Sequence, residues 1–276
     1  MSIKNLLVAF NGSQSSVAAL NVALLMHQKY GAHVTGLLAH KSDKIQLSEQ
    51  PWMPENLRKT ISQLEDQADT SIRKQFMGLC DDRVQPGKIH WISRKGHADT
   101  TVAQYARMFD LVIVGRYDTV LGTSDLNLHP DRIAVRSGRP ILVIPKDFQP
   151  QRINEHAVIA WDGQRAVARA VFEAMQILET KSLIDVISIE DGRIAKPLDE
   201  IGVKTMLERH VDNVSHHKLA VNGSTVGKVM VDFCNKVDAG LLVMGAYEHS
   251  KFAHDMFGGV TTDVIRDTRV PVLMSH

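Results

Sequence analysis

A segment that could bind an anion lies near the C-terminus, at residues 245–261 (GAYEHSKFAHDMFGGVT). It begins where an apolar, strand-like run ends, and it closes with two glycines before a helical pattern. A glycine at a strand end lets the backbone approach a phosphate closely, and the free amides at a helix start favour an anion. The candidate ligand groups are the backbone amides and the hydroxyl of Gly245, Gly258, Gly259, Val260 and Thr261.

Asp162 is the candidate side chain for the rest of a nucleotide, because it follows an apolar run at residues 158–161. Its carboxylate could accept hydrogen bonds from a ribose hydroxyl or an adenine amine. A structural interpretation fits these residues equally well. In that interpretation Gly258 and Gly259 form a turn, and Asp162 caps the helix that begins near Gln164.

Other familiar catalytic and cofactor motifs fit the sequence poorly. No stretch supplies the G-x-G-x-x-G of a dinucleotide site or the G-x-S-x-G of a nucleophile elbow. Residues 223–228 (GSTVGK) resemble a P-loop, but only three residues separate the glycines, and Val229 stands where a Ser or Thr would bind magnesium. We therefore expect a binding protein rather than an enzyme.

Histidines are numerous, 13 in all, but their spacing does not favour a metal centre. His216 and His217 are adjacent, so in a strand they would point to opposite faces. His249 and His254 are five residues apart, a step that suits neither a helix nor a strand. We expect solvated surface histidines and no metal site.

Composition bounds the protein class. The 276 residues are 44% hydrophobic, enough for one large core or two ordinary ones, and a net charge of +1 gives no field that recruits nucleic acid or anionic lipid. Cys80 and Cys234 are too far apart in sequence for a disulfide framework and are expected to be buried thiols. No long uncharged apolar run is present. These features predict a cytoplasmic protein with no nucleic-acid and no membrane partner.

The chain contains an internal repeat. Three ordered pairs of segments match: residues 7–13 with 158–164, 111–118 with 241–248, and 139–145 with 269–275. A polar stretch holding Pro150 separates the two copies and is typical of a linker. We therefore predict two related domains, residues 1–146 and 156–276.

Each half alternates short apolar runs with helical spacing, which predicts an α/β fold. In the second half we expect strands at residues 158–161, 183–189, 217–221, 239–245 and 270–274, and helices after residue 163, at 198–210, at 225–235 and after 259. Apolar strands separated by helices require right-handed crossovers and a parallel sheet covered on both faces. The prediction is two doubly wound parallel five-stranded sheets, Rossmann-like, with ligands at the carboxyl ends of the strands.

The first half is longer than the second because of a surplus between Lys41 and Cys80. Residues 46–57 are expected to form a loop, and residues 55–79 a helix with a polar face. Such an insertion either shapes a neighbouring site or is a plain surface helix.

The combined spacing resembles that of a known family. The segment at residues 245–261 resembles the C-terminal signature of the universal stress proteins, whose nucleotide-binding members carry G-x2-G-x9-G-(S/T). Here Gly245 is followed after two residues by Glu248, and after nine more by GGVT at residues 258–261. Asp162 with Gly163 looks like the adenosine-side element of that family. The resemblance covers both halves. It implies a tandem universal stress protein with an adenine nucleotide alpha hydrolase-like fold.

This sequence also departs from the family pattern. Glu248 stands where the pattern has its second glycine, and Gly259 replaces the small hydroxyl residue. By the resemblance, Ser188 lies where the second strand's backbone meets adenine. The resemblance therefore implies a near-intact nucleotide site in the second half.

The first half departs much further from the family pattern. Asn11 replaces the aspartate, Asp118 the second glycine, and Leu128 and His129 the glycine pair. Pro130 then has no amide to offer to a phosphate. The resemblance implies that the phosphate cradle of the first half is lost.

Function follows from the resemblance as an expectation. It implies a cytosolic stress-response protein that binds ATP or another adenine nucleotide, with or without Mg, in its C-terminal half and without catalysis. The alternatives are a ligand-free interaction scaffold with vestigial pockets and a weak ATP hydrolase. We also expect the last strands of the halves, residues 141–144 and 271–274, to pair within the chain, because each would otherwise expose a sheet edge. The same edges would allow self-association as a homodimer.

Overall fold

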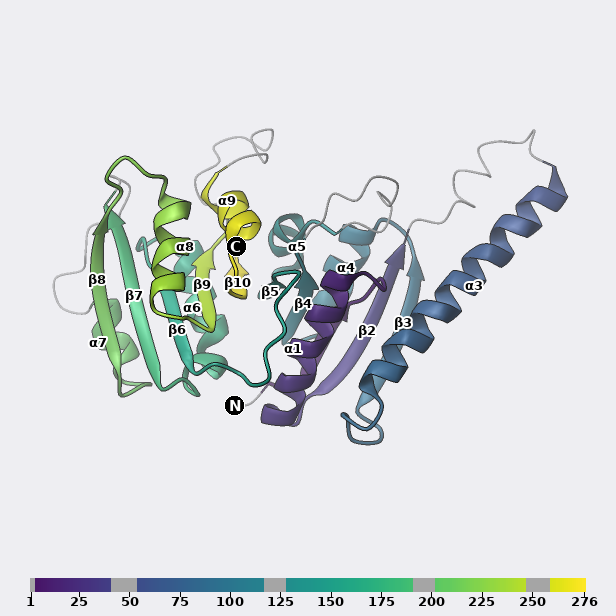
Figure 1. Cartoon of the computed structure of the whole chain (residues 1–276), viewed down its shortest axis with the longest axis horizontal. Helices are drawn as coiled ribbons and strands as arrows, with labels where there is room; N and C mark the ends of the chain where they lie inside the picture. The colour runs from purple at the N-terminus through teal and green to yellow at the C-terminus, as the bar shows by residue number, and fades with distance from the viewer. Residues whose placement is uncertain (1–2, 41–53, 117–127, 191–201, 247–258) are drawn as a thin grey trace.

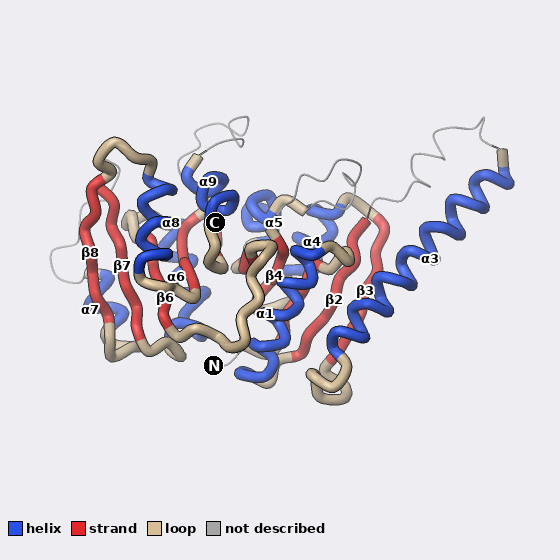
Figure 2. The backbone as a smooth tube through the Cα atoms, viewed as in Figure 1, coloured by secondary structure: helices blue, strands red, loops and turns tan. Residues whose placement is uncertain are grey.

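The computed structural model describes residues 3–40, 54–116, 128–190, 202–246 and 259–276. The first half supplies β1 (Asn5–Ala9), α1 (Gln14–Tyr30), β2 (His33–His40), α3 (Glu55–Cys80), β3 (Ile89–Lys95), α4 (Ala98–Ala106), β4 (Leu111–Gly115), α5 (Pro130–Ser137) and β5 (Ile141–Ile144). The second half supplies β6 (His156–Ala160), α6 (Arg165–Leu178), β7 (Leu183–Glu190), α7 (Val203–Leu207), β8 (Val214–Ala220), α8 (Val226–Lys236), β9 (Leu241–Gly245), α9 (Val260–Asp267) and β10 (Val272–Ser275). Strands and helices alternate within each half, and β5 is followed directly by β6 where the halves join (Figure 2).

The strands form one sheet of ten, in the order β3-β2-β1-β4-β5-β10-β9-β6-β7-β8. Within each half every pairing is parallel, and the order is that of a doubly wound unit. Buried residues of α1, α3, α6 and α7 pack on one face, and those of α4, α5, α8 and α9 on the other. The predicted fold class, two doubly wound parallel α/β units in tandem, is therefore confirmed, and their two five-stranded sheets join into one.

The two halves meet through their last strands, as predicted. β5 and β10 pair antiparallel, with Leu273 opposite Leu142 and Met274 opposite Ile141. All four of these side chains are buried. Pairing of the two terminal strands removes two apolar edges and leaves β3 and β8 at the ends of the sheet. Figure 1 shows the consequence: the two halves lie on either side of β5 and β10.

Apolar periodicity predicts the buried faces well. Val167, Val171, Ala174 and Leu178 recur along α6, and all four are buried against the sheet. Cys80 and Cys234 are buried free thiols, as expected. Burial raises the pKa of Cys80 to about 11 and that of Cys234 to about 12.

Most predicted boundaries in the second half agree with the structure to within two residues, and two elements differ by more. β8 begins at Val214, three residues before the predicted start, because Val214 pairs with Ile184 of β7 although polar residues follow it. α7 ends at Leu207, before the predicted end at residue 210, and residues 198–201 of the predicted helix lie outside the described part.

α3 lies beside β3 at the outer edge of the first half and extends past the sheet (Figure 1). Most of its side chains are exposed, and its buried residues are Phe76 and Cys80. The predicted helix is confirmed. The loop expected before it lies largely outside the described residues. None of the helices in the described ranges has the length and apolar character that a membrane span requires.

Candidate functional site

The start of α9 is the candidate phosphate-binding element of the second half. Gly259 precedes the helix with φ of 136°, a backbone conformation that favours glycine, and it makes no side-chain cap bond. Val260 opens the helix, and Thr261 is 6% exposed. Gly258, Glu248, His249 and His254 lie outside the described residues.

Asp162 forms the turn that leads into α6. Its Oδ1 accepts a hydrogen bond from the Gln164 amide at 2.9 Å. In the first half, Asn11 Oδ1 accepts from the Ser13 amide at 3.1 Å. The same turn contact therefore occurs at the start of α6 and of α1. A contact between Asp162 and a ligand remains a prediction.

Ser188 lies in β7, which pairs with β6, the strand that precedes Asp162. Its hydroxyl donates to the Trp161 carbonyl at 3.0 Å and lies 2.9 Å from His216 Nε2. Because the single hydroxyl proton goes to the carbonyl, His216 Nε2 is the donor in the second bond. Burial, with smaller contributions from Lys218 and other nearby cations, lowers the pKa of His216. A lowered pKa favours the neutral ring, whose Nε2–H donates to the Ser188 hydroxyl.

Gly245 brings the strand end of β9 against the first turn of α6. A Cβ at this position would lie 2.7 Å from the Val167 nitrogen and 2.9 Å from the Ala166 Cβ. In the first half, a Cβ at Gly115 would likewise lie 2.5 Å from the Ser15 backbone. Close helix packing therefore explains this glycine without a ligand, and it places the Asp162 turn beside the end of β9.

α8 positions the start of α9. A Cβ at Gly227 would lie 3.2 Å from the Asp263 Cβ and 3.5 Å from the Val260 carbonyl oxygen. Counted from the helix caps, His97 of α4 and Thr225 of α8, Gly227 corresponds to Asp99 of the first half. The same place beside the helix start therefore holds a carboxylate in one half and no side chain in the other.

In the first half that carboxylate occupies the helix start. Asp99 Oδ1 accepts from the His129 amide at 2.8 Å, and Asp99 Oδ2 lies 2.8 Å from His129 Nδ1. Pro130 is the first helical residue and has no amide. Leu128 is half-buried, and Asp118 lies outside the described residues. An anion would have to displace the Asp99 carboxylate.

The insertion helix packs over β2 of the first half. Phe76 of α3 is 0% exposed, and its ring lies 5.4 Å from that of Phe10 and 5.1 Å from that of Trp91. A Cβ at Gly36 would lie 2.7 Å from both Phe76 and Trp91. The insertion helix thus covers Gly36 in the middle of β2.

Strand register shows what corresponds to this aromatic cluster in the second half. In the first half, Gly36 of β2 pairs with Val8 of β1 and with Trp91 of β3. In the second half, Val186 of β7 pairs in the same way with Ile159 of β6 and with His216 of β8. Trp161 stands at the place of Phe10. The surroundings of Ser188 are therefore the counterpart of the space that Phe76 occupies.

Sequence reasoning did not single out Phe76 and Asp99, and it considered His216 only as a metal ligand. Phe76 had a signal, because it is the sole aromatic residue of a polar helix. Asp99 and His216 act through contacts 30 and 28 residues away, which no local pattern reports. In the described ranges, no group of three or more His, Cys, Asp or Glu side chains is arranged to hold a metal ion.

Comparisons with known proteins agree with this architecture. Residues 156–276 match the model of the universal stress protein family. Universal stress protein Slr1230 of Synechocystis sp. is 28% identical over 179 residues, which cover 60% of this chain and 57% of that relative. The match therefore spans little more than half the length of that relative.

Solved structures share the fold over almost the whole chain. A universal stress protein from Archaeoglobus fulgidus has a TM-score of 0.68 at 13% identity, covering 99% of this chain and 96% of its own. A protein of unknown function from Pseudomonas aeruginosa has a TM-score of 0.53 at 14% identity, with 98% and 92% covered. At these identities the likeness shows the fold of both halves.

Proposed function

Because residues 156–276 belong to the universal stress protein family and the first half repeats its fold, we propose that the protein is a stress-response protein. It binds an adenine nucleotide in the C-terminal half and does not turn it over. It works in the cytoplasm, in keeping with the composition of the chain.

The contrast between the two halves carries this proposal. In the first half, Asp99 occupies the helix start and Phe76 fills the space above β2. In the second half, Gly227 stands at the place of Asp99, and Gly259 opens α9 without a side-chain cap. This contrast supports phosphate binding at the start of α9, where the amides of a helix N-terminus favour an anion.

The remaining roles follow from chemistry. The Gly258, Gly259 and Val260 amides and the Thr261 hydroxyl would face the phosphate, and the Ser188 strand would face the adenine. A carboxylate can accept about four hydrogen bonds, so Asp162 can cap the turn and also bind a ribose hydroxyl. If Mg²⁺ accompanies ATP, Glu248 is the candidate carboxylate ligand.

Hydrolysis gains little support from the described residues. Ser188 and His216 are hydrogen-bonded, but Ser188 is only 5% exposed and donates its proton to the Trp161 carbonyl. A serine nucleophile needs access to substrate and a base that accepts its proton. This pair meets neither requirement.

A ligand-free scaffold is the second candidate function. Two predicted site residues have structural contacts that are sufficient in themselves: Asp162 accepts a hydrogen bond from the Gln164 amide in the turn before α6, and Gly245 admits the first turn of α6. If those contacts are their whole role, the pockets are vestigial, and the joined halves serve as an interaction platform.

Calorimetric titration with AMP, ADP and ATP, with and without Mg²⁺, separates the two candidates. We expect binding that Gly259→Val abolishes, since valine cannot adopt the backbone at this position and would cover the amides. The matched variant His129→Val, at the helix start of the first half, should bind as the native protein does. No binding by the native protein favours the scaffold.

A further inference from the structure

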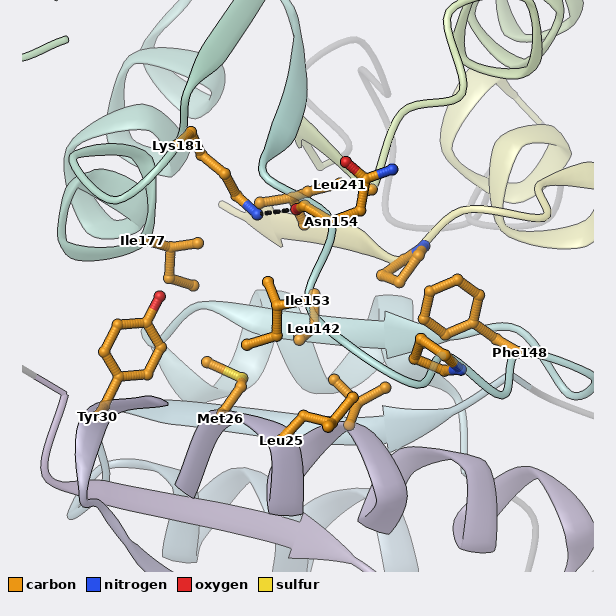
Figure 3. Close-up of a pocket in the computed structure, with 14 residues that line it drawn as sticks. Leu25, Met26, Tyr30, Leu142, Phe148, Ile153, Asn154, Ile177, Lys181 and Leu241 are labelled. Atoms are coloured by element: carbon orange, nitrogen blue, oxygen red, sulfur yellow. Dashed lines mark hydrogen bonds between the residues drawn. The ribbon is translucent and has the colours of Figure 1, made fainter. Parts of the chain in front are cut away.

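A small, mostly apolar cavity lies where the two halves of the chain meet (Figure 3). Its volume is about 50 Å³. α1 contributes Val22, Met26 and Tyr30, and the second half contributes Ile177, Lys181 and Leu241. A single water molecule needs about 10 to 15 Å³ of such space, so the cavity holds about four water molecules or a small ligand body of comparable size.

Lys181 places a charged group in this apolar setting. Its side chain is 2% exposed. The ammonium donates to the Asn154 carbonyl at 2.5 Å, and Glu155 Oε2 lies 3.9 Å away, beyond hydrogen-bond distance. An ammonium carries three donors, and the described contacts account for a hydrogen bond from one.

The charges around the cavity do not balance. Glu155 is shared by two lysines, because its Oε1 binds Lys29 Nζ at 2.7 Å while its Oε2 faces Lys181. Oε2 is buried without a hydrogen-bond partner among the described atoms. Two cations and one carboxylate leave a net positive charge beside an apolar cavity. Burial, together with Lys29 and against the effect of Glu155, lowers the pKa of Lys181 to about 8.

We propose that this cavity binds a small apolar monocarboxylate, whose carboxylate pairs with Lys181 and whose carbon body packs between α1 and α6. One added negative charge balances the cluster, and the apolar walls suit an aliphatic or aromatic body. A phosphate ester would bring a second charge for which the cavity offers no partner. The site is separate from the nucleotide site and does not depend on it.

Binding should be coupled to protonation. The ionisable groups that face Lys181 are Lys29 and Tyr30 on α1 and Glu155 in the linker. A carboxylate stabilises the charged ammonium and raises its pKa, so the complex takes up a proton when it forms near pH 8. Above that pH the affinity should fall.

Titration calorimetry with hexanoate and benzoate tests the site, with hexanol as the neutral control. We expect hexanoate to bind about tenfold or more tightly than hexanol, and proton uptake at pH 8 when buffers of different ionisation enthalpy are compared. Lys181→Met should remove the preference for the carboxylate. The matched exposed variant Lys228→Met should keep it.

A second variant guards against a folding defect in Lys181→Met. Val22→Phe leaves the lysine in place and fills the cavity, so it should abolish binding of hexanoate. Two results would overturn the proposal: no saturable binding of hexanoate or benzoate at millimolar concentration, or binding that neither variant alters.

Discussion

The buried ammonium of Lys181 gives the protein a pH dependence of stability that can be worked out from its environment. In the unfolded chain the lysine titrates near 10.5, and in the folded protein its pKa is lowered to about 8. Above pH 8 the folded state therefore binds fewer protons than the unfolded state at this residue. The contribution of Lys181 to the free energy of unfolding therefore rises with pH between 8 and 10.5. It is lost as the pH falls through 8.

The magnitude follows from the two pKa values. Raising the pH from 7 to 9.5 should add about 2 kcal/mol to the free energy of unfolding through Lys181 alone. Cys80 and Cys234 act in the opposite direction above pH 9, because burial raises their pKa to about 11 and about 12. A comparison with Lys181→Met cancels the cysteine contribution, since both proteins keep the two thiols.

Urea denaturation of the native protein and of Lys181→Met at pH 7, 8, 9 and 9.5 measures this difference. Relative to the variant, the native protein should gain about 2 kcal/mol across the series. Lys228→Met, which changes an exposed lysine, should follow the native protein. A difference between native protein and Lys181→Met that is constant with pH would refute the reasoning.

Three further outcomes are expected. Asp162→Ala should weaken nucleotide binding by about 1.5 to 3 kcal/mol if the carboxylate contacts the ligand, whereas a cap alone costs about 1 kcal/mol of stability; calorimetry and a thermal melt of one variant distinguish them. Phe76→Ala should cost about 3 to 5 kcal/mol of stability by urea denaturation while nucleotide affinity is unchanged, and a large change in affinity would contradict the assignment of Phe76 to the packing of the first half. Glu248→Gly should tighten ATP binding about a hundredfold without Mg²⁺, because a carboxylate about 5 Å from a phosphate repels it by roughly 3 kcal/mol; equal affinities would count against that repulsion.

Much of the fold could be predicted because its signals are local. Val167, Val171, Ala174 and Leu178 recur at helical spacing, and the same side chains are buried in α6. The repeat of the sequence predicted the repeat of the fold, and the apolar last strands predicted the pairing of β5 with β10, whose antiparallel direction comes from the structure. β8 was placed too late because it is an edge strand with exposed polar residues, where pairing with β7 replaces apolar patterning.

The site was harder to predict because it depends on contacts between distant residues. Asp99 reaches the start of α5 from another helix, and Phe76 reaches β2 from the insertion. Neither contact leaves a periodic pattern. Gly245 was interpreted through phosphate chemistry, but its neighbours show that helix packing alone demands a glycine there. The sequence motif shows that a glycine stands at this position, but only the packing of β9 against α6 shows why a glycine is needed there.

Native mass spectrometry of the full chain with AMP, ADP or ATP tests the central claim most directly, since it counts the nucleotides bound per chain. We predict one adenine nucleotide per chain in the native protein and in His129→Val, and none in Gly259→Val. Two nucleotides per chain, or one that persists in Gly259→Val, would contradict the assignment of the site to the C-terminal half.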